Sequence, residues 1–229
     1  MSGNPAAAAA ATLLRVAAMT SPGAAFPSPA FPGPALGPLR PSYPVETERL
    51  LLRPIDPVGD VDGMHAYRSR ADVCRYIPPE PMDRAQIAER LANPDFSRAE
   101  LDREGQALTL AVVLKETGEL IGDVVIFWRS TEHRGGEIGY VINPDHHGNG
   151  YATEAARALL ALLFDEFRLH RVTARIDAEN PASAAVLTKL GMRREAVLVE
   201  NEWFKGRWST EIDFAILDRE WRALRGQDG

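Results

Sequence analysis

The chain contains little cysteine: Cys74 is the single one among 229 residues. One cysteine cannot form a disulfide within the chain, and this scarcity is typical of proteins from a reducing compartment. We therefore expect a cytoplasmic protein. Cys74 itself is better interpreted as a small buried hydrophobic residue than as a nucleophile.

Long apolar runs and blocks of basic residues are also missing. No stretch has the roughly 20 apolar residues that cross a bilayer. The net charge of −6 comes from 26 Lys and Arg against 32 Asp and Glu, with the two signs interleaved. Nothing resembles the basic stripe that follows a phosphate backbone. We expect neither a membrane nor a nucleic acid as partner.

The histidines do not predict a metal site. Zinc sites need His, Cys or carboxylate ligands at close, regular spacing. Four of the five histidines lack such spacing with a cysteine or carboxylate partner: His133, His146, His147 and His170. No metal cofactor is expected.

The first 44 residues differ in composition from the rest. They are mostly alanine, proline, glycine and serine, and proline recurs from Pro22 to Pro44. Because proline removes backbone hydrogen-bond donors, this composition predicts a disordered or polyproline-like tail over 1–44. One domain of about 180 residues is expected over 45–224, with a short tail over 225–229. The alternative of a translation start at Met19 stays open.

The remaining sequence alternates between strand and helix patterns. Apolar alternation and turn signals predict the order β-αα-βββ-α-β-α-ββ, an α/β fold with one mixed sheet and helices on its faces. The strands are expected over 49–53, 108–114, 120–128, 137–142, 171–176, 194–199 and 209–217, and the helices over 60–70, 83–91, 152–167 and 181–190.

The most informative segment is Glu137–Arg157, in which a strand leads through a glycine loop onto a helix. Asn143-Pro144 ends the strand, Gly148 and Gly150 follow, and a helical apolar pattern begins at Ala152. Glycines let the backbone approach a ligand closely, and the free N–H groups of a helix start attract anions. The segment therefore predicts an anion site that suits a pyrophosphate.

Other nucleotide-binding loops fit this segment less well. No Gly-Lys-Ser/Thr follows for a P-loop, and the third glycine of a dinucleotide fingerprint is missing. A glycine-rich turn without any ligand remains the plain alternative.

The spacing His147-x-x-Gly150-x-Ala152 resembles the Arg/Gln-x-x-Gly-x-Gly/Ala loop with which GNAT-superfamily acetyltransferases hold the pyrophosphate of acetyl-CoA. His147 departs from the usual arginine or glutamine. Two segments are similar to sequences of the Rim-type branch, which acetylates N-terminal amines of ribosomal proteins. They are the motif Gly-Asn-Gly-Tyr-Ala-Thr-Glu-Ala and the aromatic-glycine-aromatic turn near the C-terminus.

The resemblance covers essentially all of 45–224 and implies the GNAT-like acyl-CoA N-acyltransferase fold. In that fold, the strand before the loop and the strand after the long helix splay apart around the pantetheine arm. Acetyl-CoA is then the co-substrate, and the expected cofactor-binding residues are Tyr140, Val141, Ile142, His147, Gly148, Asn149, Gly150, Tyr151, Ala152, Thr153 and Asn180.

The same resemblance implies two catalytic residues. Glu137, in front of Ile-Gly-Tyr, matches the carboxylate proposed as base in the Rim-type branch, although an exposed strand-end glutamate is commonplace. Ser183 matches the serine that protonates the leaving thiolate, whereas Leu187 stands where many relatives have a tyrosine. Asn180 followed by Pro181 is also a good helix N-cap and first-turn pair, and both roles can hold together.

These residues together predict transfer of an acetyl group from acetyl-CoA to a primary amine by direct attack in a ternary complex. The acceptor is a protein N-terminal amine or a small molecule. Two alternatives stay open: a CoA-binding regulatory module with little activity, and an antibiotic-modifying acetyltransferase. The oligomeric state, monomer or homodimer, is not determined by the sequence.

Overall fold

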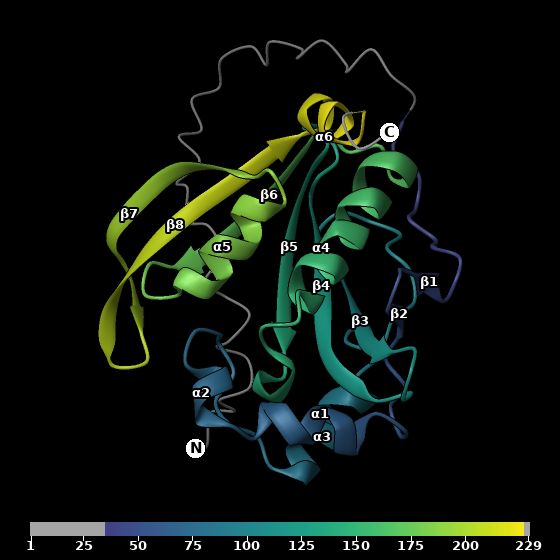
Figure 1. The fold of residues 1–229 in the computed structure, drawn as a ribbon, viewed down its shortest axis with the longest axis vertical. Helices are drawn as coiled ribbons and strands as arrows, with labels where there is room; N and C mark the ends of the chain where they lie inside the picture. Colours follow the sequence, from purple (N-terminus) through teal and green to yellow (C-terminus); the bar gives the residue numbers. More distant parts are fainter. Residues whose placement is uncertain (1–34, 227–229) are drawn as a thin grey trace, which may run out of the picture. The chain divides into compact units, whose positions relative to one another are not determined.

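The computed structural model describes residues 35–226, which form one eight-stranded sheet in the order β1-β2-β3-β4-β5-β6-β8-β7 (Figure 1). All neighbouring strands are antiparallel except β5 and β6, which run parallel. The strands are β1 Val45–Glu46, β2 Leu50–Pro54, β3 Ala107–Leu114, β4 Leu120–Ser130, β5 Gly135–Ile142, β6 Arg171–Asp177, β7 Arg193–Phe204 and β8 Arg207–Leu217.

Helices cover both faces of this sheet. The helical segments are α1 Val61–Arg68, α2 Ala71–Cys74, α3 Arg84–Ala92, the short turn η2 Pro144–His146, α4 Tyr151–Ala161, the π-helical turn η3 Leu162–Glu166, α5 Pro181–Lys189 and α6 Asp218–Arg225. Two of them begin at side chains that the sequence singled out. Asp83 accepts a hydrogen bond from the Gln86 N–H, and Asn180 accepts one from the Ser183 N–H.

Strand alternation creates two separate hydrophobic clusters. On β3, Leu108 and Leu110 point into the larger cluster, whereas Ala111 and Val113 point into the smaller one. The larger cluster packs α4, α5 and α6 against the sheet, and the smaller one packs α1 and α3 against its opposite face. Figure 1 shows α4 and α5 lying across the front of the sheet, with α1, α2 and α3 at its lower end.

The predicted α/β class and the order of the main elements are confirmed, and some boundaries are corrected. β1, α2 and α6 were not predicted, because each is short and offers too few residues for a periodic pattern. The long helix expected over 152–167 changes to a π-helical turn at Leu162. The last two strands are longer than expected: only Lys205 and Gly206, both at positive φ, form the turn that was assigned to 201–207.

The predicted tail is corrected where the structure describes it. Leu39 is buried at 3% exposure and forms a backbone bridge with Leu101, and the Tyr43 hydroxyl donates to the Ala99 carbonyl at 2.8 Å. Residues 35–44 therefore belong to the folded domain, because burial of a leucine stabilises the folded position even of a proline-rich segment. The rest of the predicted tail, 1–34, and residues 227–229 lie outside the described residues.

β5 and β6 pair only near one end. Their register runs from Gly135 opposite Arg171 to Glu137 opposite Thr173, and no pairing continues towards Ile142. The splay that the resemblance implied is therefore present. We call the space between Ile138–Ile142 and the second half of β6 the β5–β6 gap.

Candidate functional site

The loop between β5 and α4 has the backbone conformation that glycine permits. Gly148 and Gly150 lie in the left-handed region, at φ 81° and 82°. Gly150 is also the N-cap of α4, so the loop passes directly into the helix. A Cβ at Gly148 would meet nothing within 4 Å, which leaves this side of the loop open to a ligand. Both glycines are therefore placed as the sequence predicted.

Backbone donors gather at this loop. Among the described residues, the N–H groups of Gly148, Asn149 and Gly150 find no protein acceptor. The first-turn N–H groups of α4, from Tyr151 onwards, have no partner within the helix. Together with the positive end of the helix dipole, these donors can hold an anion with several oxygens, as the predicted pyrophosphate site requires.

Two polar side chains of the loop are turned towards the loop's own backbone. The Nε2 of His147 lies 2.9 Å from the Ile142 carbonyl oxygen. Because a carbonyl only accepts, Nε2 carries the proton in this contact. The Asn149 amide donates to the His146 carbonyl at 3.1 Å. The loop therefore presents its backbone N–H groups to a ligand more than its side chains. This agrees with the presence of His147 where the family usually has arginine or glutamine.

The end of β5 directs further donors into the β5–β6 gap. The Asn143 N–H donates to the Ile121 carbonyl of β4, so odd-numbered residues of β5 face β4 and even-numbered ones face β6. Tyr140 and Ile142 therefore point their N–H groups into the gap, beyond the last β5–β6 pair. Val141 points its N–H group towards β4. The backbone contact with the cofactor that the sequence predicted for Tyr140–Ile142 is therefore available only to Tyr140 and Ile142.

A hydroxyl pair spans the gap on the face covered by α4 and α5. The Tyr140 hydroxyl lies 2.8 Å from Ser183 Oγ and donates to the Ser183 carbonyl at 3.1 Å. Burial raises the pKa of Tyr140 to about 12, against the opposite effect of the Ser183 hydrogen bond. Sequence reasoning assigned only the backbone of Tyr140 to the site. No local pattern pairs two residues 43 positions apart, so this side-chain contact could not be predicted.

Asn180 lies next to this pair. Its side chain accepts from the Ser183 N–H at 3.1 Å, which fixes the first turn of α5. The N-cap role that the sequence offered is therefore confirmed. Leu187, where many relatives have a tyrosine, is fully buried in the larger cluster and provides no hydroxyl.

Glu137 lies on the other face of the sheet, at the last residue of β5 that pairs with β6. Its side chain is 28% exposed and accepts a hydrogen bond from Arg129 Nε at 3.0 Å. Alternation along β5 places it on the same face as Val141 and opposite to Tyr140. A carboxylate and the Tyr140–Ser183 pair therefore approach the gap from opposite faces.

Carboxylates outnumber guanidinium groups on this second face. Arg175 of β6 lies 2.7 Å from Asp213 and 3.7 Å from Glu211, and the charge of Glu137 acts on it as well. Burial raises the pKa of Glu202, and the neighbouring charge of Glu211 raises it further, against the effect of Arg175. We call Glu137 with its partner Arg129, Arg175, Glu202, Glu211 and Asp213 the carboxylate face, in which four carboxylates stand against two guanidinium groups. Its excess of negative charge favours a cationic ligand.

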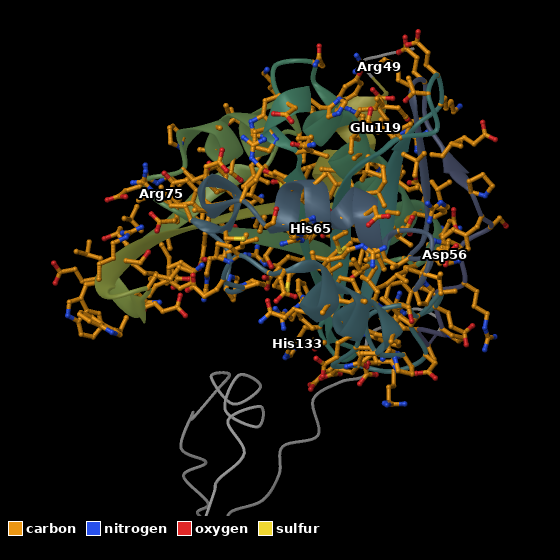
Figure 2. All side chains as sticks on the ribbon, turned by 90° about the horizontal axis from the view of Figure 1, so that it is seen from below. Arg49, Asp56, His65, Arg75, Glu119 and His133 are labelled. Carbon is orange, nitrogen blue, oxygen red and sulfur yellow. The ribbon has the colours of Figure 1, made fainter. Side chains whose placement is uncertain are left out.

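The tip of the β7–β8 hairpin contacts the segment that follows α2. The Lys205 ammonium donates to the carbonyls of Cys74 and Pro79 at 2.7 and 2.9 Å, which ties the hairpin to the segment between α2 and α3. Arg75, labelled in Figure 2, adds an ion pair with Glu179 at 3.1 Å. These contacts join segments that lie more than 100 residues apart in sequence.

The described residues contain neither a cluster of metal ligands nor a membrane-spanning helix. No group of three or more His, Cys, Asp or Glu side chains is arranged to hold a metal ion. Within 35–226, no helix combines the length and apolar character needed to cross a bilayer.

Comparison with known proteins identifies this arrangement. The model of the acetyltransferase (GNAT) domain family matches residues 49–193. The uncharacterized N-acetyltransferase YnaD of Bacillus subtilis is 34% identical over 177 residues, which are 77% of this chain and 98% of that protein. The spermidine N(1)-acetyltransferase of Vibrio cholerae is 26% identical, over 76% of this chain and 95% of that protein.

Solved structures agree on the fold. The GNAT-family acetyltransferase from Bacillus anthracis superposes with a TM-score of 0.67 at 33% identity, covering 76% of this chain and 98% of that one. Spermidine N-acetyltransferase from Vibrio cholerae, in complex with CoA and spermine, gives 0.65 at 23% identity, with 77% and 99% covered.

The mixed sheet, its splayed parallel pair and the glycine loop define an acyl-CoA N-acyltransferase fold. The chain belongs to the GNAT acetyltransferase family. It is therefore an acetyl-CoA-dependent N-acetyltransferase, and acetyl-CoA is its co-substrate. The loop fits this molecule, because its free N–H groups and the start of α4 suit a pyrophosphate.

Proposed function

We propose that this protein acetylates a primary amine by direct attack in a ternary complex, with the reaction taking place in the β5–β6 gap. The observation that carries this proposal is the convergence of three groups on that gap. Glu137 approaches from one face, the Tyr140–Ser183 pair approaches from the other, and the N–H groups of Tyr140 and Ile142 point into it.

Glu137 is proposed as the base. An alkylamine is mostly protonated at pH 7 and attacks a carbonyl carbon only after it has lost a proton. Glu137 accepts this proton directly or through one water. Arg129, 3.0 Å away, holds the carboxylate in place. The amine nitrogen then forms its bond to the acetyl carbon, and the thioester carbonyl becomes a tetrahedral oxyanion.

The other two contributions stabilise charge. As the amine adds, negative charge develops on the thioester oxygen, and the N–H groups of Tyr140 and Ile142 are proposed to donate to it. The carbonyl then re-forms, the carbon–sulfur bond breaks, and the nitrogen loses its second proton to water. Ser183 then gives its hydroxyl proton to the leaving sulfur. The Tyr140 hydroxyl, 2.8 Å from Ser183 Oγ, orients the serine and can replace the proton it has given up.

For the binding of acetyl-CoA, we propose the loop residues predicted from the sequence, chiefly through their backbones. These are His147, Gly148, Asn149, Gly150, Tyr151, Ala152 and Thr153, with Asn180 beside the pantetheine arm. The free N–H groups of the loop and the left-handed glycines support this assignment.

The acceptor follows one of two proposals. The sequence motif Gly-Asn-Gly-Tyr-Ala-Thr-Glu-Ala supports the Rim-type branch, for which the acceptor is a protein N-terminal amine. A small polyamine is the second candidate, because two kinds of observation favour it. Spermidine acetyltransferases are among the relatives, and the carboxylate face carries excess negative charge beside Glu137.

An acceptor panel tests the function and separates these candidates. Release of the CoA thiol would be followed with acetyl-CoA and each of three acceptor types: spermidine and spermine, peptides with free N-terminal amines, and aminoglycosides. A polyamine acceptor predicts turnover that weakens at high salt, because screening reduces its attraction to the carboxylates. Tight acetyl-CoA binding without turnover on any amine would instead support a regulatory CoA-binding module and contradict the proposal.

Gly150→Val tests whether the loop binds through its backbone. Valine is strained at φ 82°, so the loop should change shape. We expect acetyl-CoA affinity to fall tenfold or more, about 1.4 kcal/mol, when measured by calorimetry. His147→Ala should cost less, because that ring contacts Ile142 rather than the loop opening.

The matched control is Gly105→Val. Gly105 also has a positive φ, 87°, but lies in the turn before β3. It should lose stability without losing acetyl-CoA affinity. A larger loss from His147→Ala than from Gly150→Val would show that the side chain, and not the backbone, holds the pyrophosphate.

A further inference from the structure

Arg49, immediately before β2, reaches across to the glycine loop from about 100 residues away in sequence. Its Nη1 donates to the Asn149 carbonyl at 3.0 Å, and its guanidinium lies 4.7 Å from the centre of the Tyr151 ring. A Cβ on Gly150 would lie 3.6 Å from Arg49 Nη2. The guanidinium therefore packs along the loop and the first residue of α4. Figure 2 shows Arg49 on a different side of the domain from Arg75.

Glu154, in the first turn of α4, fixes Arg49 in this position. Its Oε2 accepts from Arg49 Nε at 2.8 Å and Nη2 at 2.6 Å, and its Oε1 accepts from the Arg49 N–H at 2.8 Å. Thr47 Oγ1 also donates to Oε1 at 2.6 Å. Burial alone would raise the pKa of Glu154, but these hydrogen bonds together lower it. The carboxylate is thus the centre of a network that joins the turn between β1 and β2, the loop and α4.

We propose that Arg49 and Glu154 form a clamp that holds the Gly148–Gly150 loop in its cofactor-binding conformation. The proposal rests on the proposed role of this loop in binding acetyl-CoA. In it, Arg49 is a positioning residue: it acts through the loop, whose glycines would otherwise lose much conformational entropy on binding. A loop already ordered in the free protein avoids this cost.

Simple electrostatics and the clamp make opposite predictions for Glu154. A carboxylate near a pyrophosphate repels it, so Glu154→Gln should tighten acetyl-CoA binding if charge alone mattered. The clamp predicts weaker binding, because one amide oxygen cannot accept all four hydrogen bonds that the two carboxylate oxygens accept. Arg49→Lys provides the complementary test. Lysine keeps the charge but cannot hold Glu154 and Asn149 together, as a planar guanidinium can.

The experiment measures acetyl-CoA affinity by calorimetry, and steady-state kinetics with the best acceptor, for both variants. We expect each to raise the Kd and KM for acetyl-CoA about tenfold, with kcat nearly unchanged. Turnover of S-acetylpantetheine, which lacks the pyrophosphate, should not change in either variant. The control is Arg84→Ala, which breaks the exposed ion pair between Arg84 of α3 and Asp62 of α1. It should leave the affinity as it is.

Three outcomes would overturn the clamp. Unchanged or tighter binding by Glu154→Gln shows that charge dominates, and normal binding by Arg49→Lys shows that only a positive charge is needed. Equal losses with acetyl-CoA and S-acetylpantetheine show general damage to the fold. A wild-type protein that fails to bind acetyl-CoA would contradict the proposed function itself, so the two failures are distinguishable.

Discussion

Glu137→Gln should lower kcat by roughly 10²–10⁴ while leaving acetyl-CoA affinity nearly unchanged. Glutamine keeps the size of the side chain and its contact with Arg129, but it cannot accept a proton from an ammonium group. The deficit should shrink as pH rises towards the pKa of the acceptor amine, because the amine then arrives already neutral. Initial rates at saturating substrates between pH 6 and about 10 would measure this.

Two further variants make this test specific. Ser183→Ala should cost less than Glu137→Gln, because water can also protonate a thiolate. Glu89→Gln changes an exposed glutamate on α3 and should have no effect. Near-normal turnover of Glu137→Gln at neutral pH with the best acceptor would show that the base lies elsewhere, while the fold and the co-substrate would stand.

Asp123→Ala should destabilise the protein by about 3–5 kcal/mol, because it leaves a buried arginine without its partner. Both oxygens of Asp123 accept from Arg68 Nη2, at 2.5 and 2.6 Å, and the Tyr67 hydroxyl donates at 2.6 Å. The side chains of Arg68 and Asp123 are only 8% and 5% exposed. Denaturant unfolding would give the change as a lower midpoint.

The double variant Arg68→Leu/Asp123→Leu distinguishes two costs: that of leaving one buried charge without a partner, and that of losing the attraction between the two charges. It should lose less stability than Asp123→Ala, since neither charge then remains buried alone. Asp62→Ala, which removes the exposed partner of Arg84, should cost at most about 1 kcal/mol. If Asp123→Ala cost no more than Asp62→Ala, water would have to reach Arg68 in the native state.

The features that sequence analysis predicted well depend on neighbouring residues. Asp83 and Asn180 are helix caps whose partners lie three residues away, and Gly148 and Gly150 need only their own backbone angles. Local rules of this kind can be applied without knowing the fold. The main elements follow for the same reason, because their apolar periods repeat within a few residues.

The features that sequence analysis missed depend on distant contacts. Arg49 meets Glu154 over 105 positions, and Lys205 meets Cys74 over 131 positions. Leu39 is buried although proline surrounds it, because Leu101 lies opposite. No pattern within a single sequence indicates which residues so far apart come into contact, and overall composition does not indicate it either. The carboxylate face was missed for this reason too, since it is assembled from β5, β6, β7 and β8.

The short pairing between β5 and β6 has a mechanical consequence. Strands β1 to β5 and strands β6 to β8 form two half-sheets, and the backbone ladder between them runs only from Gly135 to Glu137 on the β5 side. A molecule that occupies the gap would supply the cross-links that the ladder lacks there. Bound acetyl-CoA would then hold the two half-sheets together in addition to supplying the acetyl group. Once it is bound, the two half-sheets would unfold more cooperatively.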